Sequence, residues 1–131
     1  MTPLEVVRAF VTCINTHDVD GLAALMTEDH RFIDSLGQVV RGREAVRSGW
    51  GQYFSMVREY RLQADEWLCD GLVVVLLGTA DGNYSPDGAP SPGRSWTTPA
   101  VWRAVVRGGQ VAEWRVYADN EPIRQLMGSS T

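Results

Sequence analysis

The sequence predicts a single α+β domain in which a curved, mostly antiparallel sheet wraps around N-terminal helices and an internal pocket. The main observation is a change of pattern: apolar residues largely recur at helical spacing before residue 58 and alternate as in strands beyond Tyr60. The composition is also that of a globular domain, because 44% of the residues are hydrophobic and five Trp, four Tyr and three Phe supply large side chains. We therefore expect one domain that spans residues 1–131.

Two helices are predicted at the start of the chain. The first covers residues 3–14, with Thr2 as its N-cap. Its apolar positions recur at helical spacing, namely Val6, Val7, Phe10, Val11 and Ile14. Asp18 can cap the second helix, which turns Leu22, Leu25 and Met26 inward. We expect His17, in the turn between the two helices, to be a surface polar residue, with a catalytic role as the alternative.

A strand and a third helix follow. Residues 30–36 alternate, which places His30, Phe32 and Asp34 on one face of the strand. The third helix opens at Gly42, after a short hairpin. Its wide apolar stripe consists of Val46, Trp50, Tyr53, Phe54 and Val57. A stripe of this width predicts that the helix covers a large apolar surface.

Four further strands are predicted at residues 60–67, 72–79, 98–106 and 111–118. The pair Gly108 and Gly109 predicts a tight hairpin between the last two strands. Residues 78–99 are rich in Gly, Pro, Asp and Ser, so we expect a long loop there, which is either a lid or the loose end of a hairpin. Residues 72–77 are apolar at every position, which predicts that both faces of this strand are covered, the outer one by the partner in a homodimer.

Charge and composition argue against several classes of partner. The net charge is −4, and the twelve Lys and Arg residues are spread along the chain, so nucleic acid is not expected to bind. The longest apolar run is far shorter than the ~20 residues of a membrane helix, and the start of the chain lacks the layout of a signal peptide, so we expect a cytoplasmic protein without a membrane partner. Cys13 and Cys69 form no metal-ligand or redox pattern, so no metal or cofactor is expected.

Asp34 is the candidate catalytic residue. A carboxylate that shares a strand face with Phe32 is expected to be paired or used, and burial would raise its pKa toward the range of a general base. The alternative is that Asp34 accepts backbone N–H bonds in a polar turn near Gly37. His30 lies on the same face, about 7 Å along the strand, where it could line the pocket or hand a proton to Asp34. A buried, hydrogen-bonded His30 without a chemical role is the alternative.

Three segments of the chain resemble one known superfamily: VVRAFVTCINTHDVDGLAALMTEDHRFIDSLG at the front, RGREAVRSGW in the middle and GGQVAEWRVYADNEPIRQLM at the end. They resemble the nuclear transport factor 2-like superfamily, in the branch of the ketosteroid isomerases and SnoaL-like polyketide cyclases. The resemblance implies a cone-shaped α+β barrel with an open mouth, a fold that hosts many unrelated activities.

The resemblance also implies roles for individual residues. Asp34 falls where ketosteroid isomerases keep the carboxylate that moves a proton between two substrate carbons. Phe10 takes the place of their oxyanion-donating Tyr, and their protonated Asp falls near Ala100, so steroid isomerisation is not expected. In the segment WRVYAD, Val116 replaces the catalytic Asp of the limonene epoxide hydrolases, so epoxide hydrolysis is not expected either.

The resemblance places Trp114, Val116 and Ala118 of the last strand inward, and Trp102 joins them because it has the same parity one strand earlier. Phe10 and Val116 are further expected contacts of the substrate. The aromatic walls of the pocket would then be Phe32, Trp50, Tyr53, Trp102 and Trp114, suited to a flat hydrophobic ligand. The alternative is that these aromatic residues form an ordinary core.

Three hypotheses for function follow. The first is an isomerase- or cyclase-type enzyme without a cofactor, in which Asp34 removes a proton beside a carbonyl of a small hydrophobic molecule and His30 or Tyr53 supplies a hydrogen bond. The second is a non-catalytic protein that binds a small apolar metabolite. The third is a structural dimerisation domain whose pocket is plugged by Trp50, Trp102 and Trp114.

Overall fold

A computed structural model describes residues 1–89 and 92–129 of the chain. In this part of the chain, six strands form one sheet in the order β2-β1-β6-β5-β4-β3. The sheet is mostly antiparallel, as the sequence predicts, and the one parallel pair among the described strands is β1 with β6. The elements in chain order are α1 (Pro3–Asn15), α2 (Val19–Ala24), β1 (Met26–Ile33), β2 (Val39–Arg41), α3 (Arg43–Met56), β3 (Val57–Asp70), β4 (Val73–Tyr84), the 3-10 helix η1 (Pro92–Arg94), β5 (Ser95–Arg107), β6 (Gln110–Ala118) and α4 (Glu121–Ser129).

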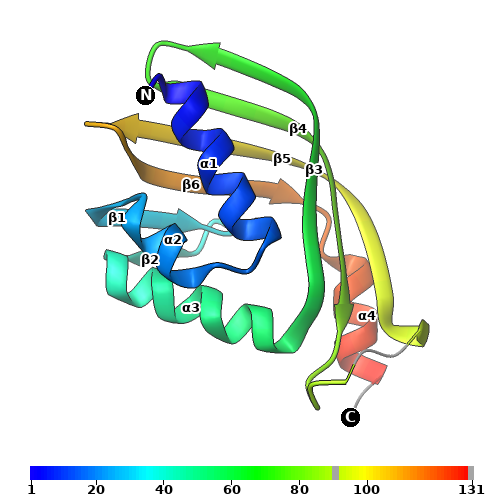
Figure 1. Cartoon of the computed structure of the whole chain (residues 1–131). Helices are drawn as coiled ribbons and strands as arrows, with labels where there is room; N and C mark the ends of the chain where they lie inside the picture. The colour runs from blue at the N-terminus through cyan, green and yellow to red at the C-terminus, as the bar shows by residue number, and fades with distance from the viewer. Residues whose placement is uncertain (90–91, 130–131) are drawn as a thin grey trace.

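The sheet is curved enough for α3 to contact both of its ends. Helix α3 packs against β1, the second strand of the sheet, and also against β3, the last one. Figure 1 shows α1 lying across one face of the sheet, with α3 beside β1 and β2 and α4 near the far ends of β4 and β5. The main core lies between α1, α3 and the enclosed face of the sheet.

The N-terminal helices form for the reasons that the sequence suggests. Thr2 and Glu5 make a reciprocal capping box at the start of α1, and the predicted apolar stripe of α1 is buried. Asp18 caps α2 by accepting a hydrogen bond from the Gly21 N–H. Met26 differs from the prediction, because it begins β1 instead of ending the helix. The Leu25 carbonyl already accepts a bond from Val111 N–H, which draws the chain into the sheet.

Strand β1 begins four residues earlier than predicted and ends at Ile33, so Asp34 lies in the turn that follows it. The Asp34 N–H donates a hydrogen bond to the Gln38 carbonyl. Gly37 lies within this turn and has a φ of +83°. Gly42 begins α3 with a φ of +94°, a conformation that favours glycine. Val57 differs from the prediction, because it starts β3 rather than continuing the stripe of α3.

The long loop predicted at residues 78–99 is wrong for most of its length. Strand β4 continues to Tyr84 and β5 begins at Ser95, which leaves only residues 85–94 as a connection. Two glycines in this stretch serve strand packing: a Cβ at Gly78 would overlap the Gln63 carbonyl oxygen, and one at Gly82 would lie 2.6 Å from Val57 Cγ1. The lid expected there also includes residues 90 and 91, which lie outside the described residues.

Side chains from the α1–α2 connection pair with the edge strand β3. Asn15 donates from Nδ2 to the Leu62 carbonyl at 3.0 Å and accepts from the Leu62 N–H at 2.8 Å. His17 Nε2 lies 2.9 Å from the Tyr60 carbonyl, and its ring stacks on Phe54 at 4.2 Å. His17 is therefore half-buried and structural rather than a freely exposed surface residue. These contacts replace a neighbouring strand along this part of the edge.

The side chain of His30 also bonds to the backbone of a strand, in this case between β1 and β6. The register of these two strands shifts between Met26 and Arg31, and His30 Nδ1 fills the irregularity at 2.6 Å from the Val111 carbonyl. The imidazole is fully buried, and burial lowers the pKa of His30. His30 is therefore held in its neutral form, with Nδ1 as the donor.

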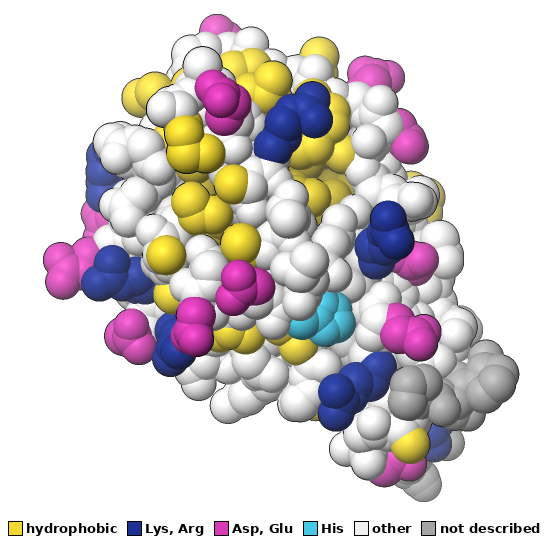
Figure 2. All heavy atoms as spheres, in the orientation of Figure 1, with side chains coloured by type: hydrophobic (Ala, Val, Ile, Leu, Met, Phe, Trp, Pro, Cys, Tyr) yellow, Lys and Arg dark blue, Asp and Glu magenta, His cyan; other side chains and the backbone are white. Residues whose placement is uncertain are grey.

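Charged groups of both signs are interspersed over the face of the molecule in Figure 2, where no continuous basic surface is visible. In the described part of the chain, no helix is long and apolar enough to cross a bilayer.

The pairing of Asn15 with β3 can be tested by mutation. Replacing Asn15 with Ala leaves both polar groups of Leu62 without their partner, so we expect the free energy of unfolding to fall by about 2 kcal/mol. Urea denaturation measures this loss. Thr12→Ala is the matched control, since its exposed hydroxyl only bonds within α1 to the Arg8 carbonyl, and it should change stability by less than about 0.5 kcal/mol. Equal losses in the two variants would contradict this role of Asn15.

The buried His30 predicts a pH dependence of stability. Because the pKa of His30 is lower in the folded chain than in the unfolded one, the unfolded chain binds the proton first as the pH falls. The free energy of unfolding should therefore be highest above the unfolded-state pKa of about 6.5 and fall as the pH drops below it. Urea denaturation between pH 7.5 and pH 5.5, chosen as about one unit on either side of that value, measures the slope. His30→Gln should flatten it, whereas Asn15→Ala should lower stability equally at each pH; an unchanged slope in His30→Gln would refute the assignment.

Candidate functional site

An aromatic cavity of about 330 Å³ lies between α3 and the curved sheet. Its lining comes from all six strands, from α3 and from the turns that follow β1 and β6. The lining residues are Phe32, Asp34, Ser35, Val40, Val46, Gly49, Trp50, Tyr53, Tyr60, Ala80, Trp96, Thr98, Trp102, Trp114, Val116, Ala118 and Asn120. The volume is large enough for a small organic molecule, which argues against the hypothesis of a pocket plugged by tryptophans.

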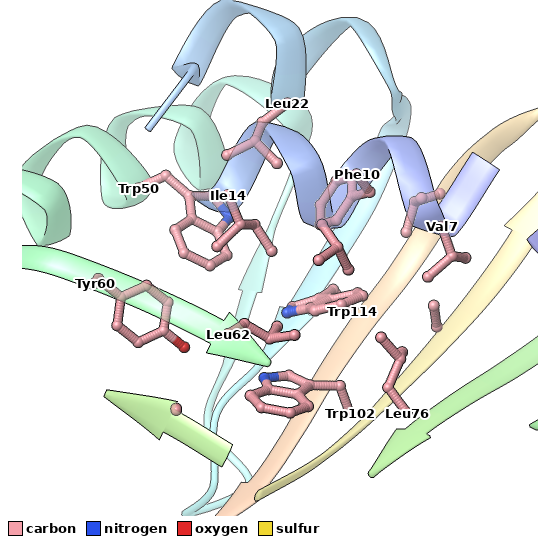
Figure 3. Close-up of a cluster of buried hydrophobic side chains, with 14 of the residues drawn as sticks. Val7, Phe10, Ile14, Leu22, Trp50, Tyr60, Leu62, Leu76, Trp102 and Trp114 are labelled. Carbon is pink, nitrogen blue, oxygen red and sulfur yellow. The ribbon is translucent and has the colours of Figure 1, made fainter. Parts of the chain in front are cut away.

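Sheet register and helix spacing bring the aromatic side chains together. Trp50 and Tyr53 are three residues apart on α3, so both reach the same side of the helix. Trp114 pairs with Phe32 on β1, and Trp102 pairs with Val116 on β6, so these side chains share the enclosed face. Figure 3 shows Trp50 approaching from α3 and Trp102 and Trp114 rising from the sheet, with Tyr60 beside them.

Asp34 lies at a polar end of this cavity. Its Oδ1 accepts hydrogen bonds from the N–H groups of Leu36 and Gln38, both at 2.9 Å. The sequence offered two interpretations of Asp34, as a residue of the pocket and as a residue of a polar turn. The structure has features of both, because Asp34 lies in the turn and also lines the cavity. Next to it in the lining, Asn120 Nδ2 donates to Ser35 Oγ. Asp34 is half-buried and is the one charged residue among the described residues of a mostly apolar lining.

Two of the residues selected from the sequence are not among the lining residues. His30 is fully buried and uses Nδ1 to bind the Val111 carbonyl, so the structure does not bring it to the cavity beside Asp34. Phe10 packs against Trp114 with ring centroids 5.0 Å apart and therefore supports the wall from behind. The other seven, Phe32, Asp34, Trp50, Tyr53, Trp102, Trp114 and Val116, line the cavity together.

Tyr60 and Trp96 line the cavity without having been selected from the sequence. Tyr60 follows a bulge in β3, where Glu59 has a φ of +59° and the register shifts between Arg58 and Arg61. A simple alternation breaks at such a bulge, so it does not predict which way Tyr60 faces. Trp96 falls within the stretch that its Gly and Pro content marked as a loop.

Two phenol groups supply hydrogen-bond donors inside the cavity. Burial raises the pKa of Tyr53, and the charge of Tyr60 contributes to this shift. Burial also raises the pKa of Tyr60, with a further contribution from Asp81. Both side chains are therefore neutral at ordinary pH and can donate an O–H to an acceptor on a ligand. Within the described residues, no three His, Cys, Asp or Glu side chains gather in a way that could hold a metal ion.

Solved structures with the same fold support this architecture. A protein with a ketosteroid isomerase-like fold from Catenulispora acidiphila, solved in complex with trimethylamine, is 19% identical and has a TM-score of 0.80 over 98% of this chain and 95% of its own. A protein from Shewanella denitrificans that is named as a SnoaL-like polyketide cyclase is 15% identical, with a TM-score of 0.82 over 97% of each chain. One from Xanthomonas campestris that is named as a polyketide cyclase is 20% identical, with a TM-score of 0.80 over 98% of this chain and 96% of its own.

These similarities confirm the cone-shaped α+β fold that the resemblance to the nuclear transport factor 2-like superfamily implies. At these identities they establish the fold and leave the chemistry open. No curated protein matches the chain. The SnoaL-like domain family matches residues 7–114, which is most of the chain and contains Asp34, Trp50, Trp102 and Trp114. The chain therefore belongs to the SnoaL-like domain family.

Proposed function

We propose that the protein is an isomerase- or cyclase-type enzyme in which Asp34 acts as general base on a small hydrophobic carbonyl compound. The observation that carries the proposal is the position of the Asp34 carboxylate in the lining of a cavity of about 330 Å³ whose other described lining residues are uncharged. A base needs to stand beside the carbon that loses a proton, and an apolar cavity excludes the water that would compete for it.

The turn around Asp34 supports this role. The N–H groups of Leu36 and Gln38 both bind Oδ1, which fixes the plane of the carboxylate. Oδ2 is the oxygen that can then approach a ligand. The hydrogen bond to the substrate carbonyl was assigned from the sequence to His30 or Tyr53, and of these two only Tyr53 lines the cavity.

The ligand is proposed to be flat and mostly apolar. Seven aromatic side chains in the lining provide broad surfaces, and the polar lining groups are few. The similar protein from Catenulispora acidiphila holds trimethylamine, which supports a small organic ligand for this fold, although not a particular one for this chain.

The role of Asp34 can be tested with Asp34→Asn and the ketone 2-acetonaphthone. The amide oxygen of Asn can still accept the two backbone N–H bonds, so the turn should persist while the base is lost. NMR in D₂O follows deuterium uptake at the carbon next to the carbonyl. We expect the variant to lose the enzyme-dependent rate by about 10²- to 10⁴-fold.

Affinity for the ketone should change little in Asp34→Asn, as measured by quenching of tryptophan fluorescence. Asp34→Ala is the comparison that also removes the turn contacts, so it should lose stability as well as exchange. An exchange rate in Asp34→Asn equal to that of the unmodified protein would refute Asp34 as the base.

A non-catalytic binding protein for a small apolar metabolite is the second candidate. It is favoured by the engagement of Asp34 Oδ1 in the turn and by the absence of His30 from the described lining. The same experiment distinguishes the two functions. A binding protein would take up 2-acetonaphthone without accelerating deuterium exchange above the rate in buffer, in both the unmodified chain and the variant.

We further propose that the protein is a homodimer that pairs through the outer face of the sheet. Val73, Val75 and Leu77 of β4 alternate with the buried Val74 and Leu76, and they remain half-buried in the single chain. Their cross-strand neighbours on the same face include Leu68, Val101 and Val105. A second copy of this face would cover these apolar side chains.

Analytical ultracentrifugation tests the dimer. The unmodified chain should sediment at twice its 14.5 kDa mass, and Leu77→Asp should shift it to the single-chain mass because the interface would bury a new carboxylate opposite Glu66. Thr12→Asp places the same charge on the exposed side of α1 and should leave the dimer intact. A single-chain mass for the unmodified protein at all concentrations would rule the dimer out.

A further inference from the structure

Tyr60 is turned into the cavity by an irregularity of the backbone. Between the pairs Arg58↔Asn83 and Arg61↔Asp81, two residues of β3 stand opposite the single residue Gly82 of β4. Glu59 takes a φ of +59° at this bulge, a conformation that costs free energy for a residue with a side chain. The result is that Tyr60 is only 7% exposed and lines the cavity.

The backbone and the ring of Tyr60 are both held in place. His17 Nε2 lies 2.9 Å from the Tyr60 carbonyl, which fixes the bulge from the α1–α2 connection. The ring lies edge-on to Tyr53 with centroids 5.1 Å apart, and Trp96 packs beside it at 6.1 Å. Such contacts on several sides leave the phenol few orientations, so its hydroxyl is positioned before a ligand arrives.

The hydroxyl of Tyr60 interacts with Trp102. Figure 3 shows the Tyr60 oxygen directed toward the Trp102 indole nitrogen, which is a hydrogen-bonding neighbour of the hydroxyl. An indole N–H can only donate, so in a bond between the two side chains the Tyr60 oxygen accepts and the Tyr60 hydrogen is left for another acceptor. Among the described residues, no acceptor takes up the Tyr60 O–H, and the cavity lies beside it.

We propose that Tyr60, oriented by Trp102, donates a hydrogen bond to the carbonyl oxygen of the ligand and makes the cavity select carbonyl compounds over hydrocarbons of the same shape. The proposal rests on the proposed function in one respect, namely that the cavity takes a carbonyl compound. Tyr53 also lines the cavity and would supply a second O–H donor. Accepting a bond from Trp102 also polarises the Tyr60 O–H and strengthens its donation.

In the proposed reaction, Asp34 moves the proton and Tyr60 stabilises the negative charge on oxygen. Asp34 takes a proton from the carbon next to the carbonyl, the electron pair of that C–H bond forms a C=C bond, and the C=O electron pair moves to the oxygen. Tyr60 keeps its proton and stabilises the oxyanion by hydrogen bonding. Return of the proton from Asp34 to a carbon of the same ligand restores both groups. No oxidant or second reactant is needed.

Infrared spectroscopy of bound 2-acetonaphthone, labelled with ¹³C at the carbonyl, tests the donor directly. In the unmodified protein the C=O stretch should lie at lower wavenumber than in hexane, because a hydrogen bond weakens the C=O bond. Tyr60→Phe should move the band most of the way back to its position in hexane. Trp102→Phe should move it part of the way, since the hydroxyl remains but is no longer oriented. Tyr84→Phe, a buried tyrosine outside the lining, is the matched control and should leave the band unchanged.

Binding of a matched ligand pair provides a second readout. 2-Ethylnaphthalene has a CH₂ group where 2-acetonaphthone has its C=O. Tyr60→Phe should weaken binding of the ketone by about 2- to 10-fold and leave binding of the hydrocarbon unchanged. Equal weakening of both ligands would indicate a role of Tyr60 in packing alone and would overturn the proposal.

The outcomes separate this proposal from the proposed function. A shifted C=O band that persists in Tyr60→Phe but disappears in Tyr53→Phe would assign the donor to Tyr53 and overturn the proposal while leaving Asp34 as the base. If Tyr60→Phe moves the C=O band toward its position in hexane but the unmodified protein shows no deuterium exchange, Tyr60 is supported as the hydrogen-bond donor and catalysis is refuted. Failure of the unmodified protein to bind the ketone would overturn both.

Discussion

The cavity depends on how the chain between α1 and α2 is tied to the edge of β3. Asn15 replaces a neighbouring strand at Leu62, and His17 does so at Tyr60, so the outer strand is held while it bends around the helices. A free edge of this kind would have to find backbone partners in water or in another chain. Because the same contacts fix the bulge at Glu59, an interaction that protects the edge also aims Tyr60 at the ligand space.

The polar groups of the cavity come from different elements of the fold. The turn after β1 contributes Asp34 as an acceptor, whereas α3 and β3 contribute the donors Tyr53 and Tyr60. Trp102 and Trp114 line the same cavity, and the pairing of β5 with β6 sets them on the enclosed face. A cavity with the acceptor Asp34 and the donors Tyr53 and Tyr60 suits a carbonyl compound, whose oxygen accepts a hydrogen bond while a neighbouring carbon loses a proton.

Much of this arrangement follows from residue spacing. Helical periodicity predicted α1 and α3, and alternation grouped Trp102 with Trp114, because regular elements repeat the same geometry at every residue. The family resemblance then placed this group on the inner side of the sheet, where the structure also has Phe32. The failures fall where backbone geometry is irregular. Alternation placed His30 with Asp34, but the register shift in β1 and the end of the strand at Ile33 separate their roles. The bulge before Tyr60 and the packing glycines of β4 depend on partner strands that are distant in the sequence, so local patterns do not contain them.

The parallel contact between β1 and β6 has a consequence for how the chain reaches this structure. His30 and its partner Val111 are 81 residues apart. The hydrogen bonds between β1 and β6 can therefore form only after β6 has been synthesised. Closing so large a loop early is entropically unfavourable, and folding rates fall as the average separation of contacting residues grows. On the ribosome, the apolar stripe of α1 therefore emerges before β3 to β6, the strands that cover it in the folded protein. A chaperone that shields α1 during that interval would be expected to raise the yield of native protein.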